Sequence, residues 1–303
     1  MLINKASISA VFKSINAAFN NAFRGVTPTW MQYATKIPSN TSVEDYEWVS
    51  AFPRMREWLG DKQVSQLKAS NYTVKNKKYE STIEIKEDDL DDDKLGAYKA
   101  QADGAGISAA ELPDMISAEM LDAVFDTVCW DGQYMVDDDH PITDFAKNGS
   151  TTYSNDGGST ALSAATITGA QNSLGTALAA MSVLKSDEGR PLGIEGTLLV
   201  VPAALRETAN VLANSDFLMD RIVNPYKGLV KVLVNKWLTS TTAWFVIDDT
   251  LPVKPIIWQE RKAAHTVQDD GDRFMKGVLH WGVEARGVGA FGLPQGIYAS
   301  AGA

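Results

Sequence analysis

The chain has little of what catalytic and secreted proteins use most. Its 303 residues include one cysteine and three histidines, so an intrachain disulfide is impossible and a reducing compartment fits. No run of about 18 apolar residues occurs, and no basic segment with an apolar run behind it follows Met1. We therefore expect no signal peptide, no transmembrane helix and no membrane partner, and a product that is cytosolic when it is made.

Positive charge is also scarce. Lys and Arg number 28 against 38 Asp and Glu, which leaves a formal net charge of −10 at pH 7. Tight binding to a phosphate backbone draws on clustered Lys and Arg, so direct, tight nucleic-acid binding is not expected. An acidic wall would let DNA move past it without sticking, although an acidic composition also simply favours solubility.

Motifs for common reactions are missing as well. The sequence has no G-x-x-x-x-G-K-[ST] phosphate loop and no G-x-S-x-G nucleophile turn. Gly287–Gly292 does match G-x-G-x-x-G, but a dinucleotide site needs a following helix and an acidic residue about 20 positions further on. Pro294 and Gly296 would break such a helix, so we do not expect a dinucleotide site.

Carboxylates and histidines form no recognisable metal motif. Asp137–His140 offers three carboxylates and one imidazole, and Asp88–Asp93 offers more carboxylates, but neither a second histidine nor an EF-hand spacing accompanies them. His265 and His280 are isolated, and Cys129 has no basic neighbour to activate its thiol. We expect no catalytic, cofactor-binding or metal-binding residue and no cofactor, and hence a protein that is not an enzyme. A metal-dependent hydrolase built on Asp137–His140 is the alternative from a different functional class.

The apolar content is sufficient for a folded core. Hydrophobic residues make up 45% of the chain and charged residues 22%, and the length suggests about two domains. Residues 7–23 show apolar side chains at i, i+3, i+4 and i+7, which predicts an amphipathic helix. A second helix is predicted over residues 112–128, or from Lys94 if Pro113 lies inside it. Val124 and Phe125 are expected to pack on the sheet of the same domain.

The second half of the chain mixes helices and strands. Residues 147–163 are rich in Gly, Ser, Thr and Asn and predict a surface loop. A helix capped by Ser163 or Thr166 should follow, then a strand buried on both faces at residues 197–201 and a helix after Pro202. Further strands are predicted at residues 229–237, 243–247, 256–259 and 278–286. Without a strict βαβ repeat, the predicted class is α+β.

Residues 56–93 predict a two-stranded β-arm. Residues 79–86 alternate apolar and polar side chains, Tyr72 and Val74 begin a preceding strand, and residues 75–78 suit a turn between the two. Because an isolated hairpin is marginal in water, the arm must lie on its own domain or on a neighbouring subunit. We expect the second arrangement, in which replacing residues 68–84 leaves the subunit folded but abolishes closed shells.

Several motifs in this region and in the residues that follow it, in this order, resemble the major head subunit of Mu-like phages and prophages. They are Arg56-Glu57-Trp58-Leu59-Gly60-Asp61, Tyr72-Thr73-Val74-Lys75-Asn76, Tyr79-Glu80, the acidic run from Glu87 to Asp93, Cys129-Trp130-Asp131-Gly132-Gln133 and Asp138-Asp139-His140-Pro141. The resemblance extends from Lys5-Ala6-Ser7 to Tyr298. It implies a capsid protein of the HK97-type fold, whose arm would be an extended loop laid over the adjacent subunit.

The resemblance also implies a division of the chain and a set of partners. Residues 1–40 would form an N-terminal arm with its helix, 41–93 the extended loop, 94–144 and 278–303 a peripheral domain with a long spine helix, and 145–277 an axial domain. The expected function is a structural virion protein that self-assembles as hexamers and pentamers into an icosahedral head around double-stranded DNA. The residues expected to contact neighbouring subunits are Phe12, Phe19, Tyr72, Val74, Tyr79 and Ile83.

The expected partners are further copies of the chain, a separate scaffolding protein, a portal and, as an optional partner, a decoration protein. DNA would be enclosed without sequence-specific binding. The protein would reside in the virion capsid, and in the host cytoplasm during assembly. An encapsulin-type compartment of the same fold is the second alternative, and it would contain cargo protein in place of DNA.

Overall fold

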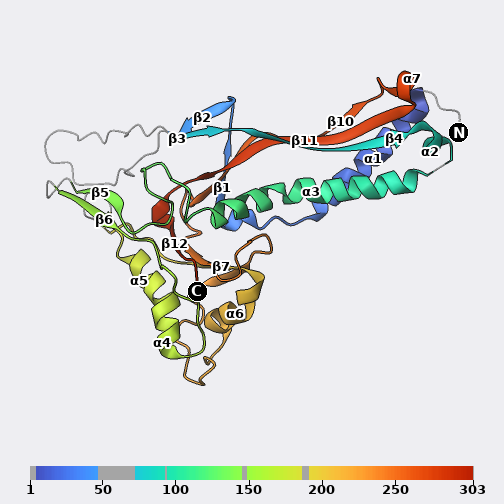
Figure 1. Ribbon diagram of the computed structural model, residues 1–303. Helices are drawn as coiled ribbons and strands as arrows, with labels where there is room; N and C mark the ends of the chain where they lie inside the picture. Colours follow the sequence, from blue (N-terminus) through green and yellow to red (C-terminus); the bar gives the residue numbers. More distant parts are fainter. Residues whose placement is uncertain (1–4, 47–71, 93, 145–148, 186–190, 303) are drawn as a thin grey trace.

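The structure is a computed structural model that describes residues 5–46, 72–92, 94–144, 149–185 and 191–302. Figure 1 shows an elongated part, in which long strands and two helices run side by side, joined at one end to a second lobe. The second lobe holds α4 (Ile167–Ala170), α5 (Thr176–Ser182), α6 (Arg206–Asn214) and β7 (Leu198–Val201). Helices and strands alternate without a βαβ repeat, so the predicted α+β class is confirmed.

The elongated part is built on a four-stranded sheet. Its order is β1 (Ala34–Pro38), β10 (Ile256–Asp269), β11 (Val278–Phe291) and β4 (Lys77–Lys86). β1 is parallel to β10, and the other neighbours are antiparallel. β10 and β11 have 14 residues each, which corresponds to roughly 45 Å at the usual rise of a strand. This pair of strands therefore sets the length of the elongated part.

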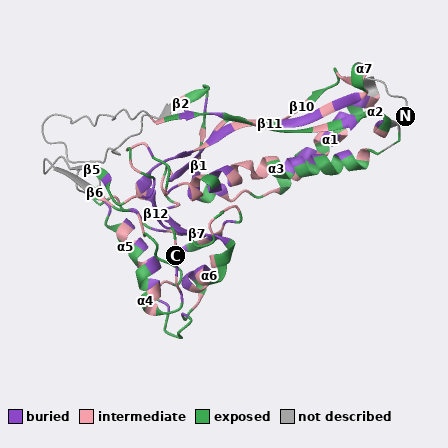
Figure 2. Ribbon diagram, viewed as in Figure 1, coloured by how far each residue is buried: buried purple, intermediate pink, exposed green. Residues whose placement is uncertain are grey.

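Two helices lie along this sheet and share a core with it. α1 (Lys5–Gly25) packs lengthwise against α3 (Leu95–Asp122), the spine helix (Figure 1). The core between them and the sheet contains Ile8, Val11, Phe12, Ile15 and Phe19 of α1, Tyr98, Ala102 and Ala105 of α3, and Ile85, Leu279, Trp281 and Val283 of the strands. The helix predicted over residues 7–23 is confirmed, and its apolar face packs on its own subunit. Figure 2 shows the resulting band of buried residues along β11.

α1 and α3 approach each other closely at Gly106. A Cβ at this position would lie 2.6 Å from the carbonyl oxygen of Phe19 and 3.1 Å from Cβ of Ala22. Gly104, on the same helix, has nothing within 4 Å of the corresponding position. Of these two glycines, only Gly106 is therefore needed for the close approach of the two helices.

We expect Gly104→Ala and Gly106→Ala to have opposite effects on stability. Gly104→Ala should raise the free energy of unfolding by up to about 1 kcal/mol, because alanine favours the helix and restricts the unfolded chain. Gly106→Ala should lower it by about 1 to 3 kcal/mol, because the backbone of α1 must move away. Urea denaturation of the dissociated subunit measures both values, and a stabilising Gly106→Ala would contradict the close packing of the helices.

A buried carboxylate holds the turn that follows α1. Oδ1 of Asp114 accepts hydrogen bonds from the backbone N–H and hydroxyl of Thr29, at 2.9 and 2.7 Å, and from the backbone N–H of Trp30 at 2.7 Å. Trp30 begins the short helix η1 (Trp30–Gln32). Asp114 lies next to Pro113, which is inside α3. The longer version of the predicted helix is thus the correct one, and a residue in its second half anchors the segment that follows α1.

The second lobe contains a smaller sheet. Its order is β12 (Ile297–Ser300), β9 (Trp244–Ile247), β7 and β8 (Lys231–Val234). Every residue of β7 is buried, which confirms the strand predicted at residues 197–201. Thr166 caps α4 by accepting a hydrogen bond from the N–H of Gly169 at 3.1 Å. A single π-helical turn (Gln171–Gly175) joins α4 to α5, and the 3-10 turn η3 (Ala203–Leu205) follows Pro202 and leads into α6.

Three local predictions need correction. The spine helix ends at Asp122, so Val124 is buried beyond its end, and Phe125 is half-buried against Phe245 of the smaller sheet. The predicted loop at residues 147–163 contains β6 (Gly149–Tyr153), which pairs with β5 (His140–Asp144). The acidic run begins with a helix, α2 (Glu87–Asp91). The remaining elements are α7 (Arg273–Lys276) and η4 (Pro294–Gly296).

The predicted hairpin at residues 72–86 is wrong. β3 (Tyr72–Lys75) pairs with β2 (Val43–Tyr46), whereas β4 pairs with β11. Asn76 lies between β3 and β4 and makes no reverse turn, since the two strands pair with different partners. Its side chain is buried and bonded to other parts of the chain. Replacing residues 68–84 would therefore remove most of a strand of the main sheet, and the expectation that this leaves the subunit folded is withdrawn. Residues 56–71 of the predicted arm lie outside the described residues.

Sheet membership divides the chain differently from the boundaries predicted from the sequence. β4, from the predicted extended loop, and β10, from the predicted axial segment, both belong to the sheet of β11. β12, from the predicted peripheral segment, belongs to the sheet of β7 and β9. Strand pairing thus joins segments that are distant in sequence and lie on different sides of the predicted boundaries. Among the described helices, none has both the length and the apolar character needed to cross a membrane.

Candidate functional site

The base of the extended loop is the first candidate functional region. Tyr46, the last residue of β2, lies opposite Tyr72, the first residue of β3. The segment 47–71 therefore leaves and rejoins the described structure at one point. A segment anchored in this way can be exchanged or shortened without a change in the register of the flanking strands.

A polar network fixes this loop base to the main sheet. The carboxylate of Glu44 accepts hydrogen bonds from the backbone N–H groups of Asn40 and Thr41, at 2.8 and 3.0 Å, and from the Ser39 hydroxyl at 2.9 Å. The amide of Asn76 donates to the Ser39 hydroxyl at 3.0 Å and accepts from Nε2 of Gln259, on β10, at 2.9 Å. Side chains from three segments thus hold the β2–β3 pair against the main sheet.

The hydrogen bonds to Glu44 give the loop base a pH dependence. The backbone N–H groups of Thr41 and Asn40 and the Ser39 hydroxyl lower the pKa of Glu44 to about 2. Because the pKa is lower in the folded than in the unfolded chain, the stabilisation is present above the unfolded value of about 4.3 and is lost as the pH falls toward 2. Glu44→Gln should therefore lower the melting temperature at pH 5 to 7, and the difference should shrink below about pH 4.5. Glu119→Gln, at an exposed position of α3, is the control, and a difference independent of pH would contradict this role.

The residues predicted to contact neighbouring subunits fall into two groups. Phe12, Phe19 and Val74 are buried in their own subunit, with 5%, 3% and 6% of their surface exposed. They therefore have little surface left for a neighbour. Tyr72, Tyr79 and Ile83 are half-buried, and the Tyr72 hydroxyl accepts a hydrogen bond from the N–H of Phe291 at 3.1 Å. Burial raises the pKa of both Tyr72 and Tyr79.

The second lobe has an exposed apolar surface that was not predicted from the sequence. It lies in the loop between α6 and β8 and comprises Phe217, Met219, Ile222, Val223 and Leu229, each about half exposed or more. The backbone N–H of Met219 donates to the carbonyl of Ala164, and the Asp220 carboxylate accepts from the N–H of Ile167. These bonds place the loop beside the start of α4, at the end of the second lobe farthest from the main sheet (Figure 1). Asn224-Pro225 is a sequence signal for a loop, but the exposure of the apolar residues near it could not be read from the sequence.

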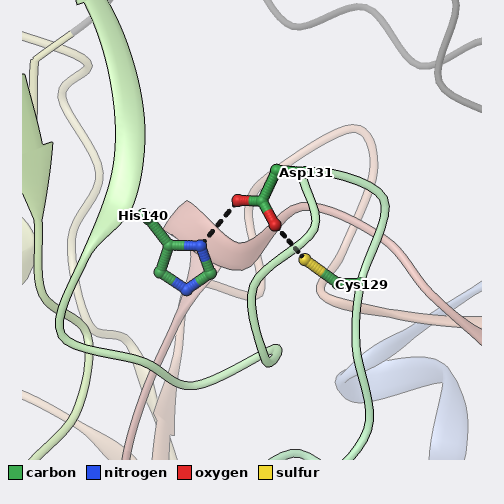
Figure 3. A group of neighbouring side chains, drawn as sticks. All are labelled: Cys129, Asp131 and His140. Carbon is green, nitrogen blue, oxygen red and sulfur yellow. Dashed lines mark hydrogen bonds and ion pairs between the residues drawn. The ribbon is translucent and has the colours of Figure 1, made fainter. Parts of the chain in front are cut away.

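A second candidate lies where the chain turns after the spine helix. Figure 3 shows the carboxylate of Asp131 between the thiol of Cys129 and the imidazole of His140. The Cys129 Sγ to Asp131 Oδ1 distance is 2.8 Å and the Asp131 Oδ2 to His140 Nδ1 distance is 2.7 Å. Gly132, at φ 93°, lies in the turn that joins them, in which its N–H donates to the carbonyl of Cys129 at 3.3 Å. His140 comes from the first position of β5 and stacks on Tyr153, at 4.9 Å between ring centroids.

The electrostatics of this cluster keep the thiol protonated and the carboxylate ionised. Burial, followed by the hydrogen bond to Asp131, raises the pKa of Cys129. Burial alone would raise the pKa of Asp131, but the hydrogen bonds from His140 and Cys129 outweigh it and lower the pKa. A protonated, buried thiol is a poor nucleophile, and the His140 side chain has no exposed surface. The cluster is thus suited to holding the turn, or an ion, and not to attacking a substrate.

The structure does not assemble the segment Asp137–His140 into a metal site. Asp137 accepts hydrogen bonds from the backbone N–H groups of Tyr134 and Asp138, and Asp138 accepts one from the Ser154 hydroxyl. Only His140 points into the cluster. Within the ranges that the structure describes, Cys129, Asp131 and His140 are the one group of three potential ligands close enough to share an ion. The hydrolase alternative therefore has no assembled ligand set at Asp137–His140.

Sequence comparison with known proteins identifies one matching family and two relatives. A family described as Mu-like prophage major head subunit gpT matches residues 8–168, 163–238 and 239–303. The Mu-like prophage FluMu major head subunit of Haemophilus influenzae is 25% identical over 296 residues, which cover 96% of this chain and 72% of that protein. The major capsid protein of Escherichia phage Mu is 33% identical over 142 residues, 47% of each chain.

Solved structures show the same fold. The subunit in the procapsid of bacteriophage JBD30 is 26% identical, with a TM-score of 0.62, and the match covers 98% of this chain and 76% of that one. The subunit of the JBD30 capsid is 27% identical, with a TM-score of 0.57, over 79% of this chain and 100% of that one. A virus-like particle from Pyrococcus furiosus, at 11% identity and a TM-score of 0.53 over 95% and 98% of the chains, shares the fold alone.

These matches confirm the HK97-like fold and a structural role as a capsid subunit, and they do not favour the encapsulin-type or hydrolase alternatives. The chain belongs to the family of Mu-like prophage major head subunits.

Proposed function

We propose that hexamers and pentamers of this chain close into the icosahedral head of a Mu-like tailed phage or prophage. The observation that carries the proposal is the match to the JBD30 procapsid subunit over 98% of the chain. Such a shell gains its stability from repetition, because every subunit makes the same modest contacts with its neighbours.

The head would enclose double-stranded DNA without sequence-specific binding. The formal net charge of −10 supports this, because a wall with few clustered cations lets the DNA slide during packaging. The proposed location is the virion capsid, with assembly in the host cytoplasm.

Three surfaces are proposed to contact further copies of the chain. The first is the segment that begins and ends at the loop base, Tyr46 and Tyr72. The second is the half-buried pair Tyr79 and Ile83 on β4. The third is the exposed apolar loop around Phe217 and Val223, since apolar groups of this size on a shell subunit gain most from burial against another copy. The buried residues Phe12, Phe19 and Val74 would support these surfaces from inside.

A scaffolding protein and a portal are proposed as partners for correct closure, and a decoration protein as an optional one. The support comes from a relative: the JBD30 shell is known as a procapsid and as a capsid decorated with minor capsid protein trimers. A shell that passes through a procapsid needs something to set its curvature before it matures.

Expression of the full chain, alone and with the scaffolding protein and portal of its own phage, tests the proposal by size-exclusion chromatography and electron microscopy. We expect capsomers, tubes or aberrant shells from the chain alone and closed, uniform shells from the mixture. Nuclease-protected DNA in particles from induced cells would support a phage head, whereas a cargo enzyme would support the compartment alternative. A sharp monomer in the presence of both partners would overturn the assignment.

A further inference from the structure

The cluster after the spine helix has two polar atoms that the described chain leaves without partners. Nε2 of His140 and the hydroxyl of Tyr153 are buried and have no hydrogen-bond partner among the described residues. Tyr153 lies opposite His140 in the β5–β6 pair, and its ring stacks on the imidazole, with 4.9 Å between the ring centroids. Buried polar atoms without partners are uncommon in folded proteins and point to a missing water or ion.

The three donors beside these atoms are those that zinc prefers. A thiolate, an imidazole and a carboxylate are all standard zinc ligands, and one such atom from each of Cys129, Asp131 and His140 lies within 4.8 Å of the others. Ligands of a tetrahedral zinc ion are about 3.3 to 3.8 Å apart. The two hydrogen-bonded pairs, at 2.8 and 2.7 Å, would need to open by only about 1 Å.

Charge also favours an ion at this position. The Asp131 side chain has 7% of its surface exposed and the His140 side chain none, and an ionised carboxylate in such surroundings needs a compensating charge. A zinc ion with one thiolate, one carboxylate and a neutral imidazole forms a site with no net charge. A water molecule would be its fourth ligand.

We propose that Cys129, Asp131 and His140 bind a zinc ion. Zinc would displace the thiol proton of Cys129, because only the thiolate binds the metal. The ion would connect the turn at residues 128–134 with the first strand of the β5–β6 hairpin and so stiffen the chain where it leaves the spine helix. This site is independent of the proposed assembly, and the buried ion would have no catalytic role.

Cobalt(II) provides a direct test because Cys129 is the only cysteine of the chain. The full chain is refolded from urea with one equivalent of cobalt(II), and its absorption is recorded after its near-ultraviolet circular dichroism has been checked. We expect a sulfur-to-cobalt charge-transfer band, lost on addition of zinc. Cys129→Ser, which keeps a donor toward Asp131, should abolish the band, and His265→Asn, which removes a histidine outside the cluster, should retain it.

Zinc binding by the same proteins gives a second measurement. We expect about one zinc per subunit by elemental analysis of the dialysed wild type, a higher melting temperature with zinc than with a chelator, and at least tenfold weaker binding in Asp131→Asn. A natively folded wild type without the cobalt–thiolate band would overturn the proposal, and so would zinc binding of equal strength in wild type and Cys129→Ser. Because the band is measured in the wild type, the test decides even if a variant fails to fold.

Discussion

Phe19→Ala should lower the free energy of unfolding of the isolated subunit by about 3 to 5 kcal/mol. Phe19 has 3% of its surface exposed, its ring centroid is 5.7 Å from that of Phe23, and it meets Trp281 edge-on at 5.8 Å. Removing the ring leaves a cavity between α1 and β11 that the packed helices cannot close. Urea denaturation of dissociated subunits should show a lower midpoint with an unchanged slope.

Lys13→Ala, at an exposed position of the same helix, is the matched control and should change stability by less than about 0.5 kcal/mol. The result separates two roles for α1. If Phe19 mainly contacted a neighbouring subunit, its removal would weaken assembly and leave the melting of the single subunit unchanged. That outcome would contradict the packing of α1 on its own core.

Replacing residues 47–71 by Asn-Gly should leave the subunit folded and abolish closed shells. Tyr46 and Tyr72 are directly opposite each other at the end of the β2–β3 pair, so a two-residue turn can join them. The polar network of Glu44, Asn76 and Gln259 and all of β4 remain in place. We expect the circular dichroism spectrum and melting temperature of the subunit to stay within error of the parent.

Assembly of this variant is measured with the scaffolding protein and portal present, by electron microscopy of the sedimented fraction. A variant with residues 47–71 replaced by a Gly-Ser linker of equal length is the control, because it keeps chain length and removes only the side chains. Both variants should fail to close if the side chains of this segment bind a neighbour. Shells of normal diameter from the Asn-Gly variant would show that the segment is dispensable for assembly.

The predictions of helices and strands succeeded where the pattern of apolar residues determines the local structure. The apolar stripe of residues 7–23 predicted α1, and the run at residues 197–201 predicted β7. Such patterns state that one face, or both, will be buried, but they do not identify the partner. The partner of α1 proved to be α3 and the main sheet of the same chain, which the sequence left open.

The hairpin prediction failed because alternation identifies a strand and not its neighbour. Residues 77–86 do form a strand, but it pairs with β11, about 200 positions later in the chain. The Lys75–Lys78 segment suits a turn by composition. Its Asn76 is buried instead, and its amide is bonded to Ser39 and Gln259, so long-range polar contacts override the local turn preference.

Sequence by itself determined the class of the molecule: few histidines, one cysteine, an acidic composition and an ordered set of motifs point to a head subunit without a reaction motif. Periodicity determined most helices and strands, since a side chain's face depends only on its neighbours a few positions away. Only the tertiary structure decided which apolar side chains are buried inside the subunit and which stay exposed. It also brought His140 to Cys129 and Asp131, because spatial proximity across a turn and a hairpin depends on how the elements pack and has no periodic signal in the chain.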